Sequence, residues 1–89
     1  MQNKSLISHQ ELIAEIESRG EQAFLGYPDY VQFGQVMFGH SLGYEIEYTW
    51  CEIDRNGYEL GSGAIPPLPT AKDVIDELLK QIKSNRGWL

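Results

Sequence analysis

Three glutamates in the middle of the chain could support acid–base chemistry if the fold brings them together. Glu45 and Glu47 stand two residues apart in a segment of alternating polar and apolar residues, and Glu59 follows a turn. Residues two apart in a strand point to one face, so Glu45 and Glu47 would share a face. Glu59, on the strand that follows the turn, would lie opposite them. Two carboxylates held close can raise the pKa of one and so supply an acid and a base. A solvated acidic surface is the commoner interpretation of this pattern. A third interpretation, between catalysis and a merely solvated surface, is an acidic patch that binds a basic protein or mimics a nucleic-acid backbone.

Cys51 and the two histidines, His9 and His40, are the other side chains suited to catalysis or metal binding. A cysteine nucleophile needs a lowered pKa, a nearby base and access to solvent, and only the fold could bring a histidine close. The spacing lacks the paired ligands, about two to four residues apart, of structural zinc sites. We therefore expect a buried or half-buried structural cysteine, no metal, no other cofactor and no catalysis.

Gly61-Ser62-Gly63 has the small residues of a phosphate-binding loop. It lacks the further glycines and the lysine of such loops, so it predicts a bulge or the exit of a strand. The following Pro66-Pro67-Leu68-Pro69 resembles a polyproline ligand, but without a flanking arginine we interpret it as a rigid connection into the next element.

Two helices have clear start signals. Ser8 followed by Glu11 forms a capping box for a helix at about 9–19. Thr70 caps a second helix at about 71–86, in which acidic residues come early and basic residues late, as the helix dipole favours.

Three strands are predicted between the helices, at about 30–38, 44–53 and 58–64. The first is rich in β-formers, and Gly34 within it indicates a bulge or a close backbone approach, with a short helical turn as the rival interpretation. The second has strict period-two alternation. Asn56-Gly57 predicts the hairpin turn that leads to the third.

Residues 21–29 are interpreted as a connection, which leaves the order α-β-β-β-α. Consecutive strands joined by short turns favour an antiparallel arrangement, and amphipathic helices must cover one face of it. The expected fold is α+β: a single small domain, residues 1–89, with a three-stranded antiparallel sheet and two helices packed on one face.

Five short segments accompany this order of elements: Gln10-Glu11-Leu12, Pro28-x-Tyr30, His40 with Tyr44, Gly61-Ser62-Gly63 and Ala71-Lys72. Together with the order α-β-β-β-α, they resemble the double-stranded RNA-binding domain. That family places a pair of lysines before an Ala-Lys at the start of its last helix. Here Pro-Pro-Leu-Pro-Thr precedes Ala71, and only Lys72 remains.

The resemblance implies the topology, and for RNA binding it implies contacts from Glu11, His40 and Lys72. Helical spacing brings Lys83 and Arg86 within reach of the same side as Lys72.

The charge of the chain disfavours nucleic acid as a partner. The 89 residues carry a net charge of −6, and residues 20–71, in which Arg55 is the only Lys or Arg, account for the acidity. Binding to a phosphate backbone needs clustered Lys and Arg. No apolar run suits a secretory signal or a membrane span, and a lone cysteine fits a reducing compartment, so we expect a cytoplasmic protein that does not enter a membrane.

The function that these features favour is that of a small acidic accessory protein that acts by protein–protein binding. The partner is another protein, with a basic one favoured by the charge, or a second copy of the chain, because so small a domain cannot bury all its aromatic side chains. The alternative is a divergent nucleic-acid-binding domain of the double-stranded RNA-binding type. The expected partner-binding residues are Glu45, Glu47, Glu52, Glu59 and Trp50.

Overall fold

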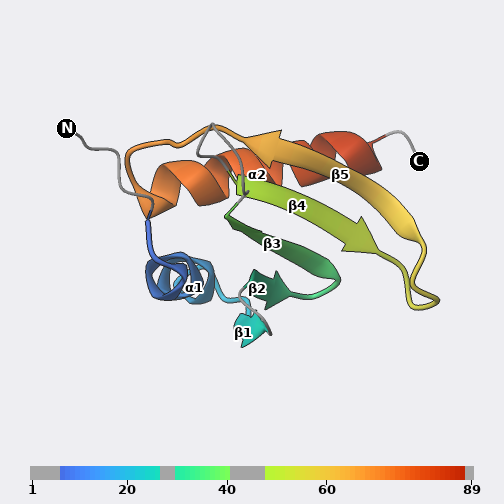
Figure 1. Cartoon of the computed structure of the whole chain (residues 1–89), viewed down its shortest axis with the longest axis horizontal. Coiled ribbons are helices and arrows are strands. Elements are labelled where there is room, and N and C mark those ends of the chain that lie inside the picture. The colour runs from blue at the N-terminus through green and yellow to red at the C-terminus, as the bar shows by residue number, and fades with distance from the viewer. Residues whose placement is uncertain (1–6, 27–29, 41–47, 88–89) are drawn as a thin grey trace.

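The computed structural model describes residues 7–26, 30–40 and 48–87, except for the side chain of His40. The chain forms two helices and an antiparallel sheet in which the spatial order of the strands follows the sequence, β1-β2-β3-β4-β5 (Figure 1). The predicted α+β class, with two helices and an antiparallel sheet, is confirmed. The predicted number of strands is wrong, since the sheet has five strands instead of three. The elements are α1 (His9–Glu17), β1 (Phe24–Gly26), β2 (Tyr30–Phe33), β3 (Val36–His40), β4 (Tyr48–Ile53), β5 (Glu59–Ile65) and α2 (Ala71–Arg86).

One additional strand arises because residues 30–38 form a hairpin and not a single strand. Phe33 and Val36 are paired, so Gly34 and Gln35 are a two-residue turn. Gly34 has a φ of +59°, and only glycines have positive φ among the described residues. A positive φ at the first turn position alone is typical of a type II′ hairpin turn. The glycine interpreted as a bulge therefore reverses the chain.

The other additional strand is β1, which lies within the predicted connection 21–29. Its three residues pair with β2, with Leu25 opposite Val31 and Gly26 opposite Tyr30. A Cβ at Gly26 would collide with the ring of Tyr30, so the glycine lets this ring lie over the edge strand. A strand this short has too few residues to show a period-two pattern.

Both helices begin where their caps predict. In α1 the Glu11 backbone N–H donates to Oγ of Ser8 at 3.2 Å, and the Ser8 backbone N–H donates to Oε1 of Glu11 at 3.1 Å. In α2 the Asp73 backbone N–H donates to Oγ1 of Thr70 at 3.1 Å. The α1 helix ends at Glu17, slightly before the expected position.

The β4–β5 hairpin is organised by Asp54. Its Oδ1 accepts from the backbone N–H groups of Asn56, at 2.8 Å, and Tyr58, at 3.0 Å. Gly57, between these two residues, has a φ of +88°. This is expected where a left-handed glycine closes a type I turn. Beyond the turn the register shifts by one residue, and Leu60 is the extra residue of a bulge.

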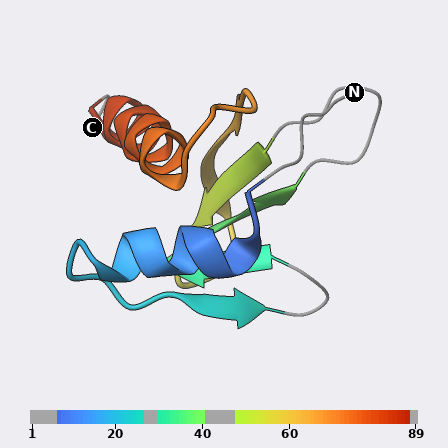
Figure 2. The ribbon, with the colours of Figure 1, turned by 90° about the vertical axis from the view of Figure 1, so that its left-hand side faces the viewer.

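The core lies between the two helices and one face of the sheet. Both views show α2 running alongside β4 and β5, and α1 lies near β1 and β2 (Figures 1 and 2). Because strand residues alternate between faces, every second described residue of β2, β3 and β4 is buried on this side. The largest buried apolar residues are Leu12 and Ile16 of α1, Val74, Ile75, Leu78 and Ile82 of α2, and Val31, Phe33, Val36, Phe38, Tyr48, Trp50 and Ile65 of the sheet.

Candidate functional site

The two faces of the sheet separate the residues that the sequence grouped as a partner-binding set. Trp50 and Glu52 are only 3% and 2% exposed, since they lie on the helix-covered face. Glu59 is exposed on β5. Glu45 and Glu47 lie outside the described residues. The described members of the set therefore do not form one surface.

Trp50 belongs to a chain of hydrogen bonds between β4, β5 and α2. Its indole N–H donates to Oε1 of Gln81 at 2.6 Å. The Gln81 amide nitrogen donates in turn to the carbonyl of Ala64, at 2.9 Å, and to Oε2 of Glu77, at 3.0 Å. Burial of an indole normally requires such a partner, so Trp50 acts here as a core residue that aligns α2 with β5.

Glu52 is held by Arg86 at the end of α2. The Arg86 Nε–H donates to Oε2 of Glu52 at 3.0 Å, and its Nη2 approaches the same oxygen more closely. The hydrogen bond to Glu52 raises the pKa of Arg86. A buried carboxylate that loses its partner is strongly destabilising, so this pair fastens α2 to the sheet.

Gly61 and Gly63 allow α2 to approach β5 closely. A Cβ at Gly63 would lie 2.6 Å from Oε1 of Gln81, and one at Gly61 would collide with the amide of Asn85. The Asn85 amide nitrogen also donates to the carbonyl of Leu60 at 3.1 Å. The Gly-Ser-Gly segment is thus a packing surface within a strand, and side chains of α2 satisfy carbonyls along this edge of the sheet.

The opposite face of the sheet forms a surface that we call the open sheet face. One row of neighbours crosses all five strands, from Phe24 through Gln32, Met37 and Cys51 to Ser62. A second row joins Gly39, Thr49 and Ala64, with Tyr30 beside Gly39. The open sheet face consists of Phe24, Tyr30, Gln32, Met37, Gly39, Thr49, Cys51, Ser62 and Ala64.

Within the described ranges both helices pack on the other face, and the apolar core lies there as well (Figure 2). Phe24 is 58% exposed, Thr49, Ser62 and Ala64 are exposed, and Met37 and Cys51 are half-buried. None of the nine residues is Asp, Glu, Lys or Arg. Depletion of charge together with Tyr and Met is typical of the centre of a protein interface.

A hollow of about 260 Å³ lies in this face above Gly39, which contributes no side chain. Its lining includes Tyr30, Met37, Thr49 and Cys51. The hollow is open to solvent, and it becomes an enclosed pocket only when a second surface covers it.

Glu59 lies at the margin of the open sheet face, near Cys51. Burial raises the pKa of the Cys51 thiol, and the negative charge of Glu59 raises it further. Nucleophilic cysteines need the opposite shift. This environment therefore favours the neutral thiol, because both influences from the described residues raise the pKa of Cys51.

The residues that the RNA-binding resemblance implied come from three elements, since Glu11 lies in α1, His40 in β3 and Lys72 in α2. Glu11 caps α1, and His40 lies in β3 with its side chain outside the described part. Arg86 holds Glu52, whereas Lys83 is exposed on α2. Lys72 belongs to the network described next.

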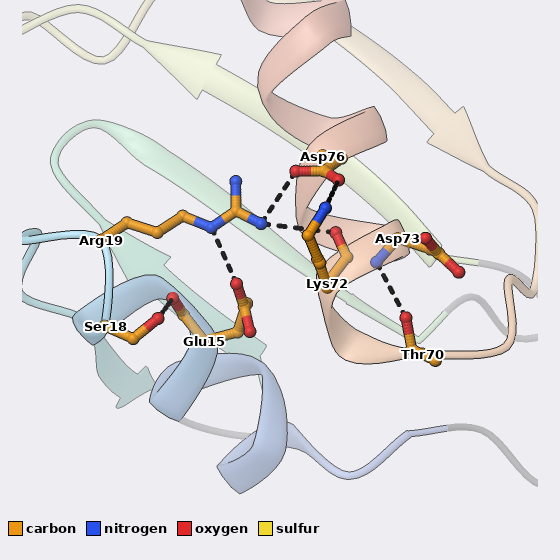
Figure 3. A network of polar contacts seen from close by, with 7 residues as sticks. All are labelled: Glu15, Ser18, Arg19, Thr70, Lys72, Asp73 and Asp76. Carbon is orange, nitrogen blue, oxygen red and sulfur yellow. Dashed lines mark hydrogen bonds and ion pairs between the residues drawn. The ribbon is translucent and has the colours of Figure 1, made fainter.

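A polar network joins the end of α1 to the start of α2 (Figure 3). The Lys72 ammonium lies 2.8 Å from Oδ2 of Asp76, and Arg19 lies 2.8 Å from Oδ1 of the same carboxylate and 2.9 Å from Oε2 of Glu15. The hydrogen bond to Asp76 raises the pKa of Lys72, and the hydrogen bonds from Lys72 and Arg19 lower the pKa of Asp76. Lys72 thus has an acidic partner within its own helix.

Among residues 7–26, 30–40 and 48–87, no group of three His, Cys, Asp or Glu side chains is placed to hold a metal ion. In the same ranges, neither helix has the length and apolar character needed to cross a membrane. Comparison of the chain with protein-family models, with curated proteins and with solved structures found no match.

The open sheet face was missed by the sequence analysis. Its signal was the pair Thr49 and Cys51, which continues the alternation of Glu45 and Glu47 with uncharged residues. The charge of the glutamates drew attention away from these two residues. The hollow above Gly39 depends on cross-strand register, which the sequence does not specify.

Proposed function

We propose that this chain is a non-catalytic interaction domain that binds another protein through the open sheet face. The observation that supports this most strongly is the uncharged surface of nine residues that crosses all five strands opposite the helices. Beside its polar residues the face has the exposed Phe24 and Ala64 and the half-buried Met37, so part of its apolar area is in contact with water. Such surfaces are typical of contact sites.

The shape of the face supports the same function. The hollow above Gly39 is an open depression, and the small or polar residues around it, Thr49, Ser62 and Ala64, allow close approach of a second protein surface. Side chains of a partner that settle into such depressions contribute a large share of the binding energy of an interface.

A basic partner remains a prediction. Of the acidic residues that suggested it, Glu59 alone is both described and exposed beside this face. The open sheet face itself favours an apolar contact, and ionic attraction would act only from its margin.

The experiment is capture of partners from a lysate at low salt, with mass spectrometry and nucleic-acid staining of one eluate. Thr49→Glu puts a charge in the centre of the open sheet face at an exposed position, so we expect it to abolish specific protein capture. Ser84→Glu adds the same charge at an exposed position of α2, and we expect no effect.

Capture that is equal for wild type, Thr49→Glu and Ser84→Glu would refute the proposal. Nucleic acid in the eluate that disappears with Lys72→Glu and Lys83→Glu, while no protein depends on Thr49, would favour the nucleic-acid-binding alternative instead.

A further inference from the structure

We infer that the protein that occupies the open sheet face is a second copy of this chain, packed face to face about a two-fold axis. This inference rests on the proposed function and names its partner. The argument depends on the shape of the face, on its charge and on its size.

The open sheet face carries a flexible apolar side chain, the half-buried Met37, directly beside the hollow. Met37 and Gly39 are two residues apart on β3, and so point to one face; Met37 borders the hollow that lies above Gly39. In an isologous interface, if residue i contacts residue j of the partner, j also contacts i. A two-fold axis between these positions places each Met37 over the Gly39 of the other copy.

The chemistry of the hollow suits this side chain. Methionine is unbranched and adapts to irregular gaps. Among the described residues, the lining of the hollow contains no ionised side chain that burial of a methionine would desolvate. A face on which Met37 and the hollow lie side by side is complementary to a second copy of itself.

Charge favours this face over the rest of the surface for contact between identical chains. Two copies that each carry a net charge of −6 repel one another. Contact through the nine uncharged residues desolvates no ionised side chain, which would otherwise be costly. Glu59 lies at the margin, where its carboxylate keeps its water.

The size of the face sets the expected affinity. Five strands about 4.8 Å apart and roughly 15–20 Å long span a flat area of about 400 Å². A standard interface buries about 800 Å² of accessible surface per partner, so the face alone supplies about half of that area, which is the size of a weak or transient contact. We therefore expect a weak dimer that dissociates on dilution into the micromolar range.

Sedimentation equilibrium over a wide concentration range tests the inference. Wild type should change from 10.1 kDa towards twice that mass, and Thr49→Glu should weaken association by at least about ten-fold, which corresponds to about 1.4 kcal/mol. Ser84→Glu should behave as wild type. Because Thr49 is exposed, the substitution leaves the core intact, which circular dichroism verifies.

Alkylation of Cys51 by a maleimide locates the contact. The rate should fall as wild-type concentration rises, since the second copy covers the thiol, and should stay constant for Thr49→Glu. A dimer that forms without protection of Cys51 lies on another surface and overturns the inference. A chain that is monomeric at every concentration also overturns it, while Thr49-dependent capture of a different protein in the lysate experiment would leave the proposed function standing.

Discussion

The contact between α2 and β5 depends on a residue without a side chain. At Gly63 the Gln81 amide and the Trp50 indole occupy the space in which a Cβ would lie, at 2.6 Å from each. The same two groups are joined by the Trp50–Gln81 hydrogen bond. The close packing of α2 on β5 and the Trp50–Gln81 hydrogen bond therefore both depend on the absence of a side chain at Gly63.

Gly63→Ala should lower the free energy of unfolding by about 1–3 kcal/mol, because overpacking forces neighbouring groups apart. Urea unfolding measures the loss. Ser62→Ala is the matched control, since Ser62 is exposed on the same strand, and its effect should stay within about 0.5 kcal/mol. Equal effects at the two positions would mean that α2 does not approach β5 as closely as described.

For single residues, the sequence contained information about Trp50 and Glu52 that their assignment to a partner-binding surface did not use. Glu52 follows Trp50 at the strand period, so alternation alone assigns both to one face, and the structure buries both. Grouping Glu52 with the other glutamates by charge ignored that period. The partner of Glu52 was not predictable, because Arg86 reaches it from an element 34 residues away.

The turn between β2 and β3 determines whether the sheet has its full set of strands. Gly34 has a φ of +59°, which L-residues adopt only at a cost. A Cβ there would meet no heavy atom within 4 Å, so the cost of a substitution is conformational and not steric.

Gly34→Ala should therefore destabilise the protein by about 1–2 kcal/mol. Gln35→Ala, at the second turn position, should stay within about 0.5 kcal/mol. Thermal and urea unfolding of the pair measure the difference. If Gly34→Ala were as stable as Gln35→Ala, the segment 30–38 would not turn at this residue.

The network between α1 and α2 should make stability depend on acid. Hydrogen bonds from Lys72 and Arg19 lower the pKa of Asp76 from 3.8. A carboxyl group whose pKa is lower in the folded state stabilises that state fully above its unfolded pKa, and the contribution is lost as the pH falls through the folded value.

Asp76→Asn should therefore be less stable than wild type near neutral pH, and the difference should shrink as the pH falls below about 4. Urea midpoints of the two proteins across this range test it. Glu17→Gln removes an exposed carboxylate of α1 as the control. A difference between wild type and Asp76→Asn that is constant with pH would mean that the ion pairs do not form.

The helices were predictable because their caps are local, whereas strand number depended on chain reversals. Ser8 with Glu11 and Thr70 with Asp73 mark helix starts within four residues of sequence. The hairpin at Gly34 lay inside an unbroken run of β-formers, and β1 becomes a strand only through its pairing with β2. Pairing of this kind is a tertiary property that a local pattern does not contain.

The whole molecule combines an acidic chain with a neutral face. Long-range repulsion between copies of a −6 chain acts through solvent and is screened by salt, over a length of about 10 Å at 0.1 M. Salt does not weaken the contact proposed for the open sheet face, because this contact brings no ionised groups together.

Raising the salt concentration from about 0.05 to 0.5 M should therefore strengthen self-association, because it screens the repulsion between the two chains. A complex with a basic protein, or with nucleic acid through Lys72, Lys83 and Arg86, would weaken over the same range, since attraction between opposite charges is screened. Sedimentation at each salt concentration measures the first, and capture from the lysate at the same concentrations measures the second. Self-association that weakens with salt would show that opposite charges, and not the open sheet face, join the two copies.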